Sequence, residues 1–237
     1  MSAFVPELAR LLEHPAIWRG RSAARTETLP TGYAALDACL PGKGWPRTGL
    51  IEILVPRFGV GELNLLLPTL AALTRRPAAR WFVWISPPLE PYAPALAAHG
   101  VVLERVLVVR APEALWAFEQ TLGSGAGDVA LAWAAHDRAV SDRAVSEGTP
   151  SGGEGIPSGE CPRPREIRRL QLAAERGKTL GVLFRPQRAA RESSPAVLRV
   201  AVEPGSRGVR LTFLKSRGGA RGSIELAFTS GCPTVGS

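Results

Sequence analysis

The sequence predicts an α/β protein with a doubly wound, mostly parallel sheet, an antiparallel C-terminal edge and a short N-terminal helix. Three observations favour this class. Apolar runs of strand length alternate with segments of helical periodicity between residues 50 and 133, as in βα units. The runs at 81–85 and 129–133 are too apolar for strands with one wet face. The last three expected strands follow one another without a helix, which indicates antiparallel pairing.

Each element follows from a local pattern. Leu8, Leu11 and Leu12 share one face of an amphipathic helix over 6–18. The apolar run over 50–55 predicts a buried strand, and the leucine spacing over 62–74 predicts a helix that Pro68 bends or interrupts. The other expected elements are strands over 81–85, 106–109, 129–133, 180–184, 196–202, 209–214 and 224–228, and helices over 34–40, 92–99, 111–122 and 165–176.

Composition restricts the class of protein. The 237 residues can bury one full core, and no apolar run is long enough to cross a bilayer, so we expect a soluble protein without a membrane partner. Three scattered cysteines and three scattered histidines have neither disulfide nor metal-ligand spacing. With no secretion signal at the N-terminus, these observations indicate a cytoplasmic protein without a metal site.

Changes in composition divide the chain into segments. We expect an N-terminal helix and linker over 1–28, the first part of the core over 29–136, the basic C-terminal part over 165–230, and a tail over 231–237. Residues 137–164 contain the repeat DRAVS twice, followed by Gly, Pro, Ser and Glu with almost nothing to bury. This composition predicts a disordered insertion.

The stretch LIEILVPRFGVGELNLLL over 50–67 has the strand, turn and helix order of a phosphate-binding loop. Such a loop has Lys and Ser or Thr after its last glycine. Here Glu62 and Leu63 stand in those places, after Pro56, Gly59 and Gly61. A carboxylate about 4 Å from a phosphate oxygen repels it by roughly 1 to 4 kcal/mol. We interpret the stretch as a degenerate phosphate loop that holds no nucleotide cofactor; an ordinary strand–turn–helix is the alternative.

Positive charge is concentrated in the C-terminal third of the chain. The net charge is +8, and residues 161–221 hold 15 of the 29 Lys and Arg residues but four of the 21 Asp and Glu residues. A one-sided basic segment favours DNA or an acidic protein surface as partner, whereas the alternative is a solvated surface whose arginine stems pack on the core. The candidate contact residues are Arg168, Arg169, Arg176, Lys178, Arg185, Arg188, Arg191, Lys215 and Arg217. For the last two, a simple hairpin turn is equally open.

The tryptophans separate into two environments. Trp81 and Trp84 belong to an apolar strand, so we expect them in the core. Trp45 lies in a loop rich in Gly and Pro, where an exposed contact residue is expected.

Several motifs together resemble one protein family. They are LDACLPGKGWP over 36–46, GELNLLLP over 61–68, WFVWISPP over 81–88, RRLQLAAE over 168–175 and LTFLKSRGG over 211–219. Their combination is similar to the ImuA family, which comprises RecA-like accessory proteins of bacterial damage-induced mutagenesis, and it covers residues 29–226 apart from the insertion. That family is similar in turn to the cell-division inhibitor SulA. The resemblance implies that the doubly wound sheet is RecA-like.

The resemblance also implies which catalytic residues a RecA-like ATPase would need. Pro88 stands where the family of ATPases has its catalytic Glu, and proline accepts no proton. Ala134 and Ala135 follow the strand that would end in a magnesium-binding Asp. Because the phosphate grip, the base and the metal ligand are all missing, we expect a protein that is not an enzyme.

The function that the resemblance implies is a non-catalytic subunit of a translesion DNA synthesis assembly, made in the SOS response to DNA damage. The implied partners are an ImuB-like inactive Y-family polymerase and an error-prone polymerase III α-subunit homologue, with RecA and DNA as further candidates. The helix with Leu8, Leu11 and Leu12 is the expected contact to RecA, because RecA protomers also hold one another by an N-terminal element. Such a protein would join the nucleoid when DNA is damaged.

Two other function classes stay open. One is a SulA-like inhibitor that binds the tubulin-like division protein; the long LDACLPGKGWP match and the basic C-terminal third favour the translesion role over it. The other is a divergent ATPase with a remodelled loop. ATP that stabilised the protein through Gly61 would favour that class.

Overall fold

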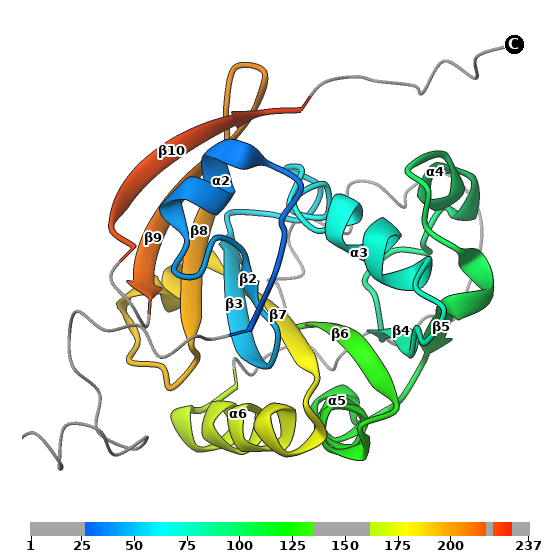
Figure 1. Cartoon of the computed structure of the whole chain (residues 1–237). Coiled ribbons are helices and arrows are strands. Elements are labelled where there is room, and N and C mark those ends of the chain that lie inside the picture. Colours follow the sequence, from blue (N-terminus) through cyan, green and yellow to red (C-terminus); the bar gives the residue numbers. More distant parts are fainter. Residues whose placement is uncertain (1–26, 135–161, 217–219, 229–237) are drawn as a thin grey trace, which may run out of the picture.

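The computed structural model describes residues 27–134, 162–216 and 220–228. Its centre is an eight-stranded sheet with helices packed against it, accompanied by a two-stranded sheet of β1 and β2 (Figure 1). The strands are β1 (Thr28–Leu29), β2 (Trp45–Pro46), β3 (Gly49–Val55), β4 (Trp81–Ile85), β5 (Val106–Val109), β6 (Gly127–Trp133), β7 (Leu180–Pro186), β8 (Leu198–Pro204), β9 (Gly208–Ser216) and β10 (Gly222–Ala227). The helices are α2 (Ala34–Cys39), α3 (Leu67–Thr74), α4 (Ala93–Ala98), α5 (Ala114–Ser124) and α6 (Pro164–Gly177), with 3-10 helices η1 (Leu103–Arg105) and η3 (Gln187–Arg191).

The order of the strands in the large sheet is β10-β9-β8-β3-β7-β6-β4-β5. Neighbours from β8 to β5 in this order are parallel. Strand β9 is antiparallel to both β8 and β10. The sheet is therefore mixed, with β5 and β10 as its two outer strands.

This architecture corrects the expected fold class. Strands β7 and β8 flank β3, and the connection between them, residues 187–197, holds only the 3-10 helix η3. Within the described residues after α6, β8, β9 and β10 are added without any α-helix. Helices α2 and α4 have six residues each. The prediction of a RecA-like doubly wound sheet is wrong, because such a sheet requires crossover helices between its parallel strands.

Helices α5 and α6 cover one face of the sheet, at the bottom of Figure 1. The core on this face contains Leu50 and Val83 from strands, Phe118 from α5, and Ile167 and Leu170 from α6. Helix α6 fits this place because its apolar residues recur at helical spacing while its arginines stay outside.

The second face holds the larger core. It joins Leu36 of α2 and Leu70 of α3 to aromatic side chains from the sheet. Trp133 and Phe184 stack with ring centroids 5.0 Å apart, and Trp84 lies 5.5 Å from Trp133. The three aromatic side chains fix β4, β6 and β7 in register from within.

Helix α3 begins later than the leucine pattern predicts. It starts at Leu67, with Pro68 in its first turn, and residues 62–66 form turns instead. Proline suits the first turn of a helix because its missing N–H has no partner there in any case. Pro68 therefore marks the start of the helix and does not bend it.

Candidate functional site at the carboxyl end of the sheet

The loop from Pro56 to Glu62 leaves the carboxyl end of β3, where α/β proteins place their ligands. Gly59 and Gly61 have φ values of 82° and 100°, which favour glycine. The backbone N–H of Gly59 donates to Glu62 Oε1 at 2.9 Å, and Glu62 is 3% exposed. The loop thus directs an amide inward as a phosphate loop does, but the acceptor is its own carboxylate.

Apolar packing closes the loop further. Phe58, Val60 and Leu63 are partly buried against the larger core. A side-chain carbon added at Gly61 would lie 2.7 Å from the ring of Phe228. Through these contacts the loop packs against the larger core and against Phe228, which follows β10.

Tyr33 fastens the turn that follows the loop. Its hydroxyl donates to the carbonyl oxygen of Asn64 at 2.9 Å, and its ring lies 6.0 Å from that of Phe228. Burial raises the pKa of the Tyr33 hydroxyl, so the group stays protonated and remains a donor.

The ends of two further strands lack the side chains of phosphoryl transfer. Strand β4 runs into Ser86, whose hydroxyl donates to the carbonyl oxygen of Ala111 at 3.2 Å and accepts the N–H of Ala111 at 3.1 Å. Pro88 follows at the position of the expected base. Strand β6 ends at Trp133 and the buried Ala134, whose N–H donates to Phe184 at 2.9 Å. Neither strand end presents a carboxylate to the loop after β3, and the described residues contain no cluster of metal-ligating side chains.

The segment between β4 and α4 exposes apolar side chains at this same end of the sheet. Leu89 is 73% exposed and Tyr92 is 71% exposed. Ser86 anchors one end of the segment, and an ion pair between Glu90 and Arg110 ties its middle to the chain after β5. Prolines at 87, 88, 91 and 94 restrict the backbone between these anchors. Exposed apolar side chains on an anchored segment are typical of a protein-binding site.

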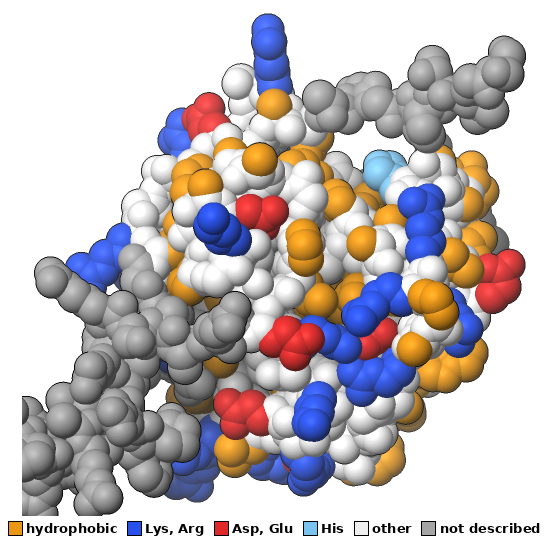
Figure 2. Space-filling model, in the orientation of Figure 1, with side chains coloured by type: hydrophobic (Ala, Val, Ile, Leu, Met, Phe, Trp, Pro, Cys, Tyr) orange, Lys and Arg blue, Asp and Glu red, His pale blue; other side chains and the backbone are white. Residues whose placement is uncertain are grey.

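Other exposed apolar residues lie elsewhere. Trp116 of α5 is 57% exposed and Leu172 of α6 is 53% exposed, on the face of the sheet that α5 and α6 cover. Figure 2 shows hydrophobic side chains on the side of the molecule that carries α4 and β5, interspersed with Lys and Arg. The described helices are all too short or too polar to cross a membrane.

The candidate basic residues do not form one cluster on a single element. Those on α6 and in the turn after it are exposed, and so are the two on η3: Arg168, Arg169, Arg176, Lys178, Arg188 and Arg191. Arg169 is paired with Glu119 of α5 at 2.5 Å, and Lys215 donates to the carbonyl oxygen of Ser194 at 2.5 Å. Arg217 lies outside the described residues, as do Leu8, Leu11 and Leu12. A contact role for the exposed arginines stays a prediction.

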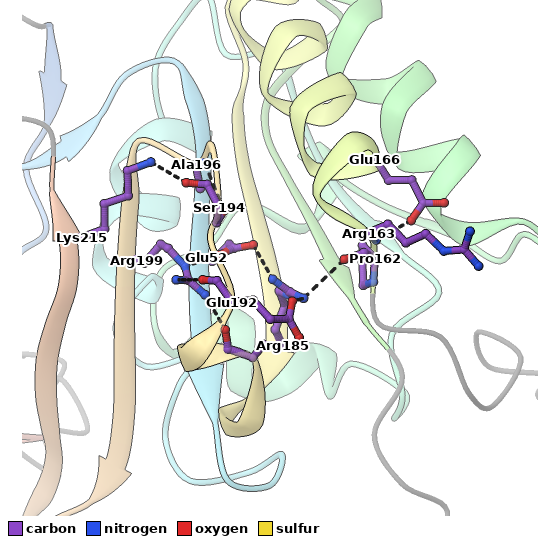
Figure 3. A network of polar contacts seen from close by, with 11 residues as sticks. Glu52, Pro162, Arg163, Glu166, Arg185, Glu192, Ser194, Ala196, Arg199 and Lys215 are labelled. Atoms are coloured by element: carbon purple, nitrogen blue, oxygen red, sulfur yellow. Dashed lines mark hydrogen bonds and ion pairs between the residues drawn. The ribbon is translucent and has the colours of Figure 1, made fainter.

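Arg185 corrects the expectation of a surface residue, because it is fully buried. Its Nη1 atom pairs with Glu52 Oε1 at 2.9 Å and its Nη2 atom with Glu192 Oε2 at 2.6 Å (Figure 3). Arg199 completes the network, with Nε 2.5 Å from Glu52 Oε2. Burial lowers the pKa of Arg185. The carboxylates of Glu52 and Glu192 raise that pKa by more than burial lowers it, so the net shift is upward. This network joins β3, β7 and β8, and the fully buried Arg185 within it cannot contact a partner.

Sequence reasoning missed a second ionic cluster, at the opposite end of the sheet. Asp128 accepts Arg47 Nη2 at 2.7 Å and the backbone N–H of Arg80 at 2.9 Å. The Arg80 guanidinium then donates to the carbonyl oxygens of Gly125 and Lys178, which follow α5 and α6. The three residues are far apart in the sequence, and only the parallel strands bring them together.

Comparisons with known proteins find two SulA proteins among other matches. The cell division inhibitor SulA of Edwardsiella piscicida is 30% identical over 155 residues, which make up 63% of this chain and 76% of that protein. The crystal structure of SulA from Pseudomonas aeruginosa has 22% identity and a TM-score of 0.40, covering 57% of this chain and 97% of that one. No protein family model matches the chain.

The first of these relatives overturns the expected partners. Its name assigns it to cell division and not to translesion synthesis. The expectation that the chain works with an ImuB-like polymerase and a polymerase III α-subunit homologue is therefore wrong.

Proposed function

Because this chain belongs to the family of the cell division inhibitor SulA, we propose that it inhibits cell division by binding the tubulin-like division protein. The 30% identity to the Edwardsiella piscicida protein over three quarters of that protein carries the proposal. The ImuA resemblance led us to expect a translesion role first. We do not propose that role, because the matched relative is a division inhibitor.

The proposed mechanism is binding without catalysis. The loop after β3 supports it, because Glu62 already satisfies the amide of Gly59 and would repel a phosphate there. Leu89 and Tyr92 form the proposed contact, since they are the most exposed large apolar side chains of the described residues and stand on an anchored segment. The exposed arginines of α6 and η3 are proposed to steer an acidic partner surface.

We further propose a cytoplasmic protein made in response to DNA damage. Division inhibition then delays the cell while damaged DNA is repaired. Nothing in this role requires a cofactor.

The experiment measures polymerisation of the purified division protein by sedimentation, with and without an equimolar amount of this chain. We expect less polymer in the pellet when the chain is present. The double variant Leu89→Ser, Tyr92→Ser should lose the effect and bind at least tenfold more weakly, because two central apolar contacts typically contribute more than 1.4 kcal/mol.

The double variant Trp116→Ser, Leu172→Ser is the matched control. It removes two exposed apolar side chains from α5 and α6, away from the segment between β4 and α4. This variant should inhibit polymerisation as the wild type does. A wild-type chain that neither binds the division protein nor reduces its polymer would refute the proposed function. Equal loss in both double variants would refute the assignment to Leu89 and Tyr92.

A further inference from the structure

A cavity of about 190 Å³ lies at the amino end of the large sheet, at the other end from Leu89 and Tyr92. Thr48, which precedes β3, and Leu198, which begins β8, both line it. Its walls are mostly apolar, and three of the apolar lining residues are only half-buried: Pro41, Pro46 and Val197. The cavity therefore leaves apolar surface open to a further group.

The size and chemistry of the cavity fit a large apolar side chain. An apolar cavity of about 150 Å³ in another protein accommodates benzene. Here the hydroxyl of Thr28 already donates to the carbonyl oxygen of Gly42 at 2.6 Å. Glu175 is the one charged side chain among the described lining residues, and its carboxylate accepts Gln171 Nε2 at 2.7 Å. The polar groups of the lining are thus few and engaged within the chain, which does not favour a charged ligand.

The chain enters the fold beside this cavity. Residues 1–26 lie outside the described residues, and Thr28 lines the cavity. The N–H of Arg47 donates to the carbonyl oxygen of Glu27 at 2.9 Å, so the point of attachment is fixed there. Eight residues separate Trp18 from Glu27, and a flexible linker of that length spans about 15 Å. A tether this short gives an effective concentration in the millimolar range.

The apolar pattern of the tethered segment suits the cavity. Leu8, Leu11 and Leu12 share one face of the helix expected over 6–18, and Trp18 continues that spacing. The proposed division contact does not use these residues. We propose that residues 6–18 pack against this cavity of their own chain, with the leucine face toward its walls. The tether favours this occupant, because a second copy or a separate protein at micromolar concentration is about a thousandfold more dilute.

The test is hydrogen exchange of the full chain without any partner, so its outcome does not depend on the proposed function. Backbone amides over 8–18 should exchange at least tenfold more slowly than those of an unstructured peptide, because packing protects them. Thr48→Trp and Ser216→Trp each fill the cavity and should remove the protection. Thr212→Trp replaces a half-buried threonine of β9 that does not line the cavity, and should retain it. Circular dichroism confirms that the variants are folded.

A second pair of variants leaves the described core unchanged, and so decides the matter if a tryptophan variant fails to fold. Leu8→Ser with Leu12→Ser removes the apolar face and should abolish the protection over 8–18. Arg10→Ser with Glu13→Ser changes the other side of the expected helix and should retain it. Unprotected amides in the wild type would overturn the proposal, and so would protection that survives both tryptophan variants. Protection lost on tenfold dilution would indicate a second copy and would also overturn it.

Discussion

Glu62 Oε1 accepts the backbone N–H of Gly59 at 2.9 Å within the loop that follows β3. In a phosphate loop such an inward amide binds the nucleotide. Here the anion is part of the chain, and Phe58, Val60 and Leu63 pack against the larger core. The loop is therefore a structural connection between β3 and α3, and its residues should affect stability more than ligand binding.

Replacement of Glu62 tests this interpretation. Glu62→Ala leaves the Gly59 amide without its acceptor, and we expect the free energy of unfolding in urea to fall by about 1 to 3 kcal/mol. Glu62→Gln keeps an acceptor oxygen and should stay within about 1 kcal/mol of the wild type. In a thermal melt, millimolar ATP with magnesium should shift neither variant nor the wild type. Stabilisation of the wild type by ATP would show that the loop still binds nucleotide.

The two glycines of the loop should respond differently to alanine. Both have positive φ, so each substitution strains the backbone by about 1 kcal/mol or more. At Gly61 the new methyl group would also lie 2.7 Å from Phe228 and 3.2 Å from Val209, whereas at Gly59 nothing lies within 4 Å. We expect Gly61→Ala to destabilise by about 1 to 3 kcal/mol more than Gly59→Ala in urea unfolding. Equal losses would mean that the loop does not pack against Phe228.

The buried network gives the largest predicted loss of stability. Arg185→Leu leaves the fully buried Glu52 without one of its two arginines, which typically costs about 3 to 5 kcal/mol. Arg185→Lys retains the charge but not the paired contacts to Glu52 and Glu192, so it should lose less and remain folded for measurement. Arg210→Leu breaks an exposed pair with Glu225 and should leave the unfolding midpoint unchanged. Equal midpoints for the Arg185 and Arg210 variants would contradict the buried role of Arg185.

The central strands could be predicted from sequence because each contains a continuous apolar run. All seven residues of β3, of β6 and of β7 are buried, but composition does not indicate the burial of Glu52, Asp128 and Arg185 within them. The class of the sheet could not be predicted so well. A periodicity of apolar residues does not show whether the 187–197 connection contains a crossover helix or only η3, and that difference separates a mixed sheet from a RecA-like one.

The candidate site shows a related limit. Arg185 belongs to a basic segment, and charge alone predicts exposure; its burial depends on Glu52, which is 133 residues away in the sequence. The expectation for Trp45 was wrong in the same way. Its loop of Gly and Pro predicts an exposed side chain, but the side chain is fully buried. The opposite holds for Trp81. We expected this strand residue in the core, but it is 43% exposed next to β5. Long-range contacts decide all three, and local patterns do not contain them.

Asp128 predicts how stability depends on pH. Burial raises the pKa of this carboxyl group, but the Arg80 N–H and the guanidinium groups of Arg47 and Arg80 lower it more, so the net shift is downward. A carboxyl group with a lowered pKa stabilises the fold above its ordinary pKa of about 3.9 and loses this effect as the pH falls through the folded value.

Asp128→Asn should therefore be less stable than the wild type at pH 7 by about 2 kcal/mol, because charged hydrogen bonds are lost. The difference should hold down to about pH 5 and shrink below about pH 4. Urea unfolding of both proteins from pH 7 to pH 3 measures it, with Glu225→Gln as a control for an exposed carboxylate. A difference that grew on acidification would mean that Asp128 is not held as the anion by Arg47 and Arg80.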